Sequence, residues 1–196
     1  LDSVLFDIKE TLSSNDSFLI GFESDHLSFS EYVGLKDVIS DMFALKPTTG
    51  MIESIRAVKD GDEISILNES VIIADHVMQA VLKNIKPGLS ELEISHMIDS
   101  YVAESDATGL AFSSIVATGL NSSFPHHEPT NEVVKEGDPL LIDMGISYKG
   151  YRSDISRTMF VGEMKEPLFT EIYSIVLEAQ NKSSQAATPG ITGGHL

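Results

Sequence analysis

The feature that most constrains this chain is a pair of strand-like segments joined by a short turn. The first segment, Leu140–Met144, is apolar except for Asp143. The second, Tyr151–Val161, alternates in polarity and contains Asp154. Between them, the short glycine-bearing stretch 147–150 is typical of a tight hairpin turn. The sequence therefore predicts two antiparallel strands that each carry one aspartate.

The length of the turn decides whether the two aspartates lie on the same face of the hairpin. With Lys149-Gly150 as a two-residue loop, Asp154 lies opposite Gly145. Because side chains alternate along a strand, Asp143 then shares a face with Asp154. A loop moved back to Tyr148-Lys149 preserves this arrangement. A bulge or a loop of odd length separates the two aspartates.

Two carboxylates that face each other need something to offset their repulsion. At a separation of ~4 Å and an effective dielectric constant of about 20, the repulsion is about 4 kcal/mol. A divalent cation would offset it, so we predict Asp143 and Asp154 as metal ligands. The alternative is that one or both are ordinary polar residues on a solvated face. The context favours the metal site, because Asp143 ends an apolar strand and Arg157-Thr158 follows Asp154 on the same hairpin.

Several further motifs occur in a defined order around this hairpin, including a polar loop with two histidines. They are Val116-Ala117-Thr118-Gly119 with Asn121, Pro125-His126-x-x-Pro129, Gly137-Asp138, Leu141-Ile142-Asp143-x-Gly145, and Gly150-Tyr151-x-Ser153-Asp154-x-x-Arg157-Thr158-x-x-x-Gly162. Together these motifs resemble the pita-bread metallopeptidases (creatinase/methionine aminopeptidase-like). Within that family they are most similar to the branch of Xaa-Pro dipeptidase (prolidase) and aminopeptidase P.

The resemblance implies an α+β fold in two parts. Residues 1–50 correspond to the C-terminal part of a creatinase-like N-terminal domain, and residues 51–62 to a linker. Residues 63–196 correspond to the first half of a pita-bread peptidase domain. Family members complete their metal site with a later histidine and two later glutamates. No matching segment precedes Leu196, so we expect this chain to be a fragment that lacks the C-terminal part.

The resemblance also implies an activity and a role for each candidate residue. Asp143 and Asp154 would bind two divalent metal ions, with Mn²⁺ favoured and Co²⁺ or Zn²⁺ as alternatives. His126 would be catalytic, through contact with substrate or proton transfer. The intact protein would hydrolyse the Xaa-Pro bond of short proline-containing peptides, and the fragment alone would be inactive. The alternatives are a creatinase-like metal-free hydrolase and a non-catalytic binding module with the same fold.

The composition limits which partners the protein is expected to bind and which cellular compartment it fits. A net charge of −17 opposes binding to nucleic acid or to an anionic membrane surface. No apolar run approaches the ~20 residues of a membrane span. The chain contains no cysteine, which fits a reducing cytoplasm and excludes a disulfide framework or a thiolate metal site. We therefore expect a cytoplasmic protein, and the resemblance adds the expectation of a homodimer.

Local patterns predict the main helices and strands. The apolar spacing and capping signals predict helices from residue 2 to 12, from 28 to 39, from 63 to 85, from 90 to 101 and from 167 to 179. Apolar runs predict strands at 18–22 and 42–45, the second ended by the stretch Lys46-Pro47-Thr48-Thr49-Gly50. In the last helix we expect Phe169, Ile172, Tyr173 and Val176 to point inward. His76, His96 and His195 are interpreted as residues that bind no metal.

Overall fold

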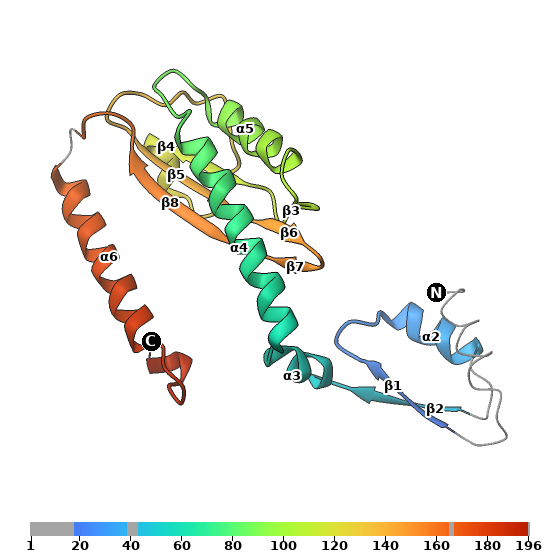
Figure 1. The fold of residues 1–196 in the computed structure, drawn as a ribbon. Coiled ribbons are helices and arrows are strands. Elements are labelled where there is room, and N and C mark those ends of the chain that lie inside the picture. Colours follow the sequence, from blue (N-terminus) through green and yellow to red (C-terminus); the bar gives the residue numbers. More distant parts are fainter. Residues whose placement is uncertain (1–17, 39–42, 165–166, 196) are drawn as a thin grey trace. The chain divides into compact units, whose positions relative to one another are not determined.

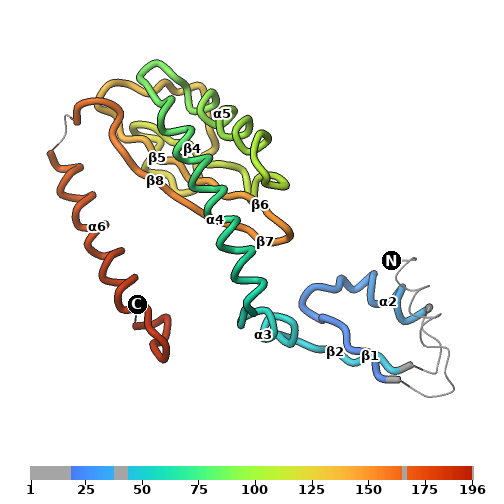
Figure 2. Tube along the Cα trace, in the orientation of Figure 1, coloured from blue at the N-terminus to red at the C-terminus, as the bar shows by residue number. Residues whose placement is uncertain are grey.

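The computed structural model of the chain describes residues 18–38, 43–164 and 167–195. The chain forms two compact units, Leu1–Asp60 and Gly61–Leu196. The expected helix at residues 2–12 lies outside the described residues. Figure 1 shows the order of the elements along the chain, and Figure 2 shows the same path as a tube.

Among its described residues, the first unit contains two parallel strands, β1 (Phe18–Glu23) and β2 (Phe43–Thr48), with helix α2 (Phe29–Val38) between them in sequence. The capping interaction expected before α2 is present, because the backbone N–H of Ser28 donates to Glu31. The second strand is longer than predicted, since β2 continues through Lys46 and Pro47 and ends at Thr48, within the stretch expected to end it. Proline fits an edge strand because its missing N–H can face away from the partner strand. A short helix, α3 (Met51–Ala57), occupies the segment expected to be a linker.

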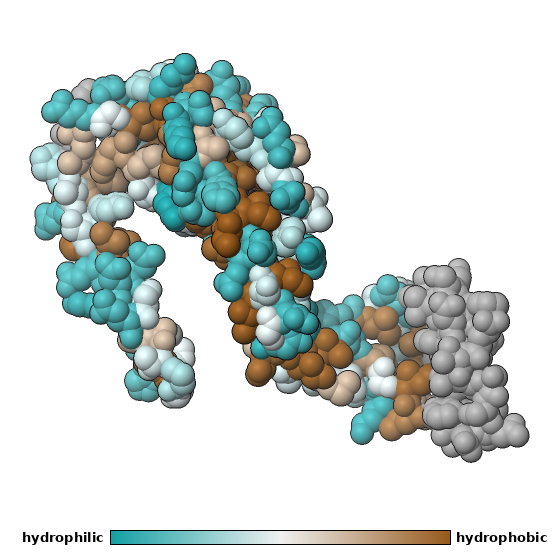
Figure 3. Space-filling model, viewed as in Figure 1, coloured by the Kyte–Doolittle hydropathy of each residue, from teal (hydrophilic) through white to brown (hydrophobic). Residues whose placement is uncertain are grey.

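Two helices form one layer of the second unit, and both confirm the predicted helical segments. Helix α4 (Gly61–Leu82) buries a stripe that begins at Ser70, while Ile64 and Val71 in its first half stay exposed. Figure 3 shows this exposed apolar surface along α4. Helix α5 (Glu91–Ala103) starts with a complete capping box between Ser90 and Glu93. The buried residues of the two helices are Ser70, Ala74, Val77, Met78, Val81, Glu91, Ile94, Ile98 and Val102.

In the part of this unit that the structure describes, six short strands make up two three-stranded antiparallel sheets. One sheet has the order β4 (Ile115–Thr118), β5 (Pro139–Met144), β8 (Ile155–Phe160). The other has the order β3 (Gly109–Leu110), β6 (Ile146–Tyr148), β7 (Tyr151–Arg152). The predicted hairpin therefore passes through both sheets, because each of its arms is divided into two strands.

The two faces of the β4–β5–β8 sheet have different surroundings. Leu140, Ile142 and Met144 of β5 are fully buried and belong to the same core as the inward residues of α4 and α5. Figure 1 shows these two helices beside the strands. Alternation along β5 places Asp143 on the opposite face. The two helices thus pack against one face of the sheet, and the opposite face, which carries Asp143, lies outside the core.

Helix α6 (Pro167–Ala186) is longer than predicted and has no buried residue. The expectation that its apolar side points into a core was wrong. Phe169 meets Phe160 of β8 edge to face, with ring centroids 5.0 Å apart, while Ile172, Tyr173 and Val176 are at least two-fifths exposed. These residues line an open groove beside β8 rather than filling a core. Within the described residues, no helix is long and apolar enough to cross a membrane.

Candidate functional site

The hairpin confirms the predicted register. Lys149 and Gly150 both have positive φ, 47° and 84°, as a two-residue hairpin loop of the primed type requires. Tyr148 pairs with Tyr151 across this loop, and the same register continues to the pair of Asp143 with Ser156. No bulge shifts the register by one residue between these pairs. The two aspartates therefore keep the shared face that the sequence predicted.

The two arms of the hairpin approach each other very closely at Gly145, where β5 ends and β6 begins. A Cβ atom at Gly145 would lie 2.0 Å from the carbonyl oxygen of Ser153 and 2.9 Å from the ring of Phe112. Only glycine allows this approach. On both sides of this point the strands remain hydrogen-bonded, with the backbone N–H of Ser153 donating to Ile146 O at 3.0 Å. The close approach places Asp154 at the break between the two sheets.

Asp143 and Asp154 meet on the face that lies away from the helices. Asp143 is half-buried, and Asp154 is exposed. The hydroxyl of Ser156 donates a hydrogen bond of 2.8 Å to Oδ1 of Asp143. Burial raises the pKa of Asp154, and the negative charge of Asp143 and a hydrogen bond between the two side chains raise this pKa further. Two carboxyl groups in such contact must share either a proton or a cation.

His126, the predicted catalytic residue, lies on an exposed loop between the 3₁₀ turn η1 (Gly119–Ser123) and β5. In the described part of the chain, no hydrogen bond or ion pair joins His126 to Asp143 or Asp154. The structure thus brings the two predicted ligands into contact with each other, and His126 bonds directly to neither of them. The neighbouring His127 is half-buried, and its Nε2 lies 2.8 Å from Oε2 of Glu91.

Glu91 is a buried acid that the sequence analysis did not identify. Its exposed fraction is 0%, although it is the first residue of α5. Four residues, from the last residue of β4 onward, direct hydrogen bonds to its carboxylate. They are Thr118 through its backbone N–H (2.8 Å), Asn121 through Nδ2 (3.0 Å), Thr130 through its backbone N–H (3.0 Å) and hydroxyl (2.7 Å), and His127 through Nε2 (2.8 Å).

These donors determine the charge of Glu91. Burial raises the pKa of the Glu91 carboxyl, but hydrogen bonds from His127, Thr130, Thr118 and Asn121 outweigh burial and leave this pKa below its ordinary value. An ionised carboxylate only accepts, so the Nε2 of His127 carries the hydrogen. A glutamate in the first turn of a helix is ordinary in a sequence, and no local signal shows that this one is buried.

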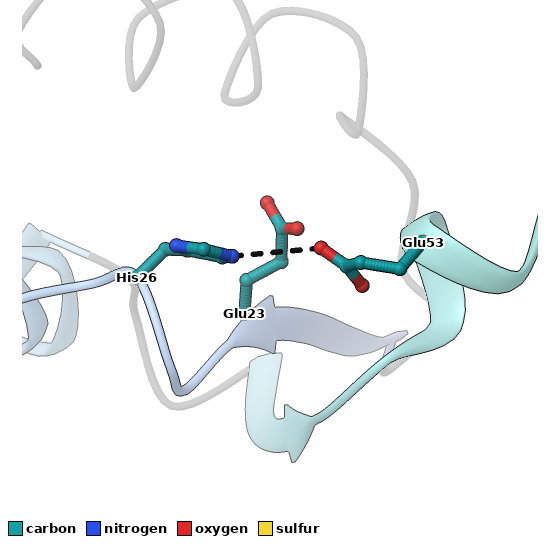
Figure 4. Close-up of side chains that lie close together, drawn as sticks. All are labelled: Glu23, His26 and Glu53. Atoms are coloured by element: carbon teal, nitrogen blue, oxygen red, sulfur yellow. Dashed lines mark ion pairs between the residues drawn. The ribbon is translucent and has the colours of Figure 1, made fainter. Parts of the chain in front are cut away.

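A second group of potential ligands lies in the first unit (Figure 4). Within the described ranges, Glu23, His26 and Glu53 are the one group of three or more such side chains whose ligand atoms lie within 4.8 Å of one another. All three are exposed, and His26 forms an ion pair of 3.5 Å with Glu53. An exposed pair of this kind is an ordinary surface contact that contributes at most about 1 kcal/mol. We therefore do not assign a function to this cluster. His76, His96 and His195 are also exposed.

The chain matches a known protein family and is similar to several known proteins. Residues 65–196 match the model of metallopeptidase family M24. The Xaa-Pro dipeptidase of Pyrococcus furiosus is 34% identical over 190 residues, which is 97% of this chain and 53% of that protein. A solved Xaa-Pro dipeptidase from Bacillus anthracis has a TM-score of 0.79 and 41% identity, over 91% of this chain and 48% of that one.

A solved X-Pro aminopeptidase from Thermotoga maritima is also similar to this chain, over a similar share of both chains. Its TM-score is 0.86 and its identity 30%, over 97% of this chain and 53% of that one. The chain thus spans about half the length of the curated relatives it matches. It resembles both dipeptidases and an aminopeptidase.

Proposed function

Since this chain belongs to metallopeptidase family M24, we propose that the full-length protein hydrolyses the Xaa-Pro bond of short peptides in a metal-dependent reaction. Membership of the family confirms the predicted α+β, pita-bread class of fold. The substrate proposal is supported by relatives named Xaa-Pro dipeptidase and by the similar X-Pro aminopeptidase. The observation that carries it is the contact between Asp143 and Asp154 on the open face of the sheet.

The two aspartates fit the ligands of a divalent metal ion. Both are carboxylates, they touch, and the raised pKa of Asp154 reflects burial and repulsion that a bound cation would relieve. Divalent ions held there would supply Lewis-acid chemistry, which polarises a peptide carbonyl and lowers the pKa of water. Carboxylate ligands suit Mn²⁺, which we propose as the metal, with Co²⁺ or Zn²⁺ as alternatives. We also propose that the second unit is the peptidase domain.

The remaining residues of the site would orient the ligands and the substrate. Ser156 holds one oxygen of Asp143, so the other oxygen is left for the metal. We assign His126 to substrate contact or proton transfer, because it is exposed and an imidazole ring can both donate and accept a hydrogen. A cytoplasmic location and a homodimer remain predictions that accompany this proposal.

The experiment that tests the proposal uses the full-length protein and the variant Asp154→Asn. We expect loss of both bound metal and hydrolysis of an Xaa-Pro dipeptide, with an unchanged circular dichroism spectrum. Metal content is measured by mass spectrometry on the purified protein. Asp99→Asn, an exposed aspartate of α5, is the matched control and should behave as wild type.

Two results would contradict this proposal in different ways. Turnover that persists in Asp154→Asn without metal would indicate a metal-free hydrolase of the same fold. A wild-type protein that binds metal and cleaves only peptides without proline would show that the substrate class is wrong.

A further inference from the structure

The network around Glu91 links one helix to both ends of the loop that carries His126. Thr118 lies at the end of β4, before this loop, and Thr130 lies after it. Both direct their backbone N–H groups to the same carboxylate, Thr118 to Oε1 and Thr130 to Oε2. Glu91 thus acts as a clamp, in which each carboxylate oxygen holds one end of the loop.

The same carboxylate reaches the interior of the loop on both sides of His126. Asn121 donates to Oε1 from the 3₁₀ turn, and His127 donates to Oε2 from the position next to His126. The loop's own hydrogen bonds are local, such as those from the N–H of Phe124 to Asn121 O and from the N–H of His127 to Phe124 O. These local bonds shape the turn but do not determine where it lies. The contacts to Glu91 fix its position.

Two further bonds come from the backbone of α5 and do not depend on the Glu91 side chain. The N–H of Glu91 donates to Glu132 O, and the N–H of Leu92 donates to Thr130 O, both at 3.0 Å. These bonds hold only the segment after the loop. A variant without the carboxylate therefore keeps the exit of the loop in place and frees its beginning and the turn around His126.

The position of the loop affects the site because the loop begins away from the two aspartates, at the other end of β4. Thr118 faces Leu140 on β5, whereas Asp143 faces Ile115 at the other end of β4. Three residues of strand separate the two points, which is about 10 Å. To contact a substrate held at Asp143, His126 has to span this distance, so the position of the loop along the sheet affects whether it can do so. A displacement of about 1 Å in a catalytic group can lower a rate on the order of 100-fold.

We propose that Glu91 is a positioning residue of the peptidase site, whose buried carboxylate holds the loop 119–129 so that His126 faces the bound peptide. This inference rests on the proposed function. Glu91 touches neither the substrate nor the metal, and it acts through His126. Its full set of donors keeps it ionised, and an ionised buried group without these partners would be strongly unfavourable. The carboxylate therefore holds the beginning of the loop and the turn around His126, while the backbone bonds from α5 also hold the end of the loop.

The test replaces Glu91 with glutamine in the full-length, metal-loaded protein. Glutamine has nearly the same shape but presents an amide N–H₂ to one group of donors. We expect kcat for an Xaa-Pro dipeptide to fall by about 10-fold to 100-fold, with KM and metal content close to wild type. Hydrogen exchange should become faster at the amides of Thr118 and Thr130 and across 119–129. Glu93→Gln, the same change on the same turn of α5, keeps the capping box and should match wild type.

A double variant separates positioning from a general loss of structure. If Glu91 acts through His126, Glu91→Gln should not lower kcat further once His126→Ala is present. If the two losses multiply instead, or if Glu91→Gln turns over at the wild-type rate, the proposal is wrong. Should Glu91→Gln fail to fold, Thr130→Val removes one donor and keeps the backbone N–H. It should show the same changes to a smaller degree.

Failure of this inference can be distinguished from failure of the proposed function. If the wild-type protein cleaves no Xaa-Pro peptide, the proposed function is wrong, and hydrogen exchange in the loop still decides whether Glu91 holds it. If the peptide is cleaved but exchange in 119–129 is unchanged in Glu91→Gln, the proposed function stands and the clamp is refuted.

Discussion

Ser156 and Asp143 face each other across β5 and β8, and the Ser156 hydroxyl donates a 2.8 Å hydrogen bond to Oδ1 of Asp143. This bond helps to fix the direction of a carboxylate that also contacts Asp154. Partners of this kind orient metal ligands and commonly influence metal affinity as much as some ligands do.

Ser156→Ala should weaken metal binding by about 10-fold to 100-fold in the full-length protein, because Asp143 loses the partner that orients it. Stability should change by at most about 0.5 kcal/mol, since Ser156 is exposed. Isothermal titration with Mn²⁺ measures the affinity. Ser100→Ala is the control, because that exposed hydroxyl bonds only to the carbonyl of His96 in its own helix. Unchanged affinity would show that Ser156 does not orient Asp143 for the metal.

His126→Ala should lower kcat on an Xaa-Pro dipeptide by roughly 10²-fold to 10⁴-fold, the range expected for a group that transfers a proton. Bound metal should stay near the wild-type level. His96→Ala, an exposed histidine of α5, provides a control for the same change. Loss of metal from His126→Ala would instead make His126 a ligand.

Gly145→Ala should destabilise the second unit, because the new Cβ would lie 2.0 Å from the backbone oxygen of Ser153. Backbone cannot move aside as a flexible side chain does, so we expect a cost at the upper end of about 1–3 kcal/mol. Urea unfolding measures the loss. Gly61→Ala in α4, which has no atom within 4 Å of the added Cβ, should be neutral or slightly stabilising. Equal stability of the two variants would contradict the close approach.

Acid should destabilise the protein partly through Glu91. The pKa of Glu91 in the folded state lies below its ordinary value of 4.5, so the unfolded chain binds the proton more tightly. The contribution of Glu91 to stability is therefore complete above about pH 4.5 and is lost as the pH falls through the folded-state pKa. Melting temperatures measured between pH 3 and 6 should fall less steeply in Glu91→Gln than in wild type. Parallel curves would mean that Glu91 does not titrate on unfolding.

Local sequence signals determined the elements whose stabilising contacts lie close together in the chain. The capping boxes at Ser28 and Ser90 join residues three positions apart, and both are present. The turn at Lys149-Gly150 set the register of the hairpin and therefore the shared face of Asp143 and Asp154. The alternation of a strand and the length of its turn are enough for this result, because neither depends on distant partners.

Only the tertiary structure decided the features that depend on contacts between distant residues. Glu91 is buried because donors 27 to 39 positions away converge on it, and no pattern around Ser90 indicates this. The apolar side of α6 looks like a core face in sequence, but it lines an open groove, since periodicity shows which side of a helix is apolar and not what covers it. Long-range contacts of this kind arise when separate elements pack together, so their outcome depends on the whole fold rather than on any one segment.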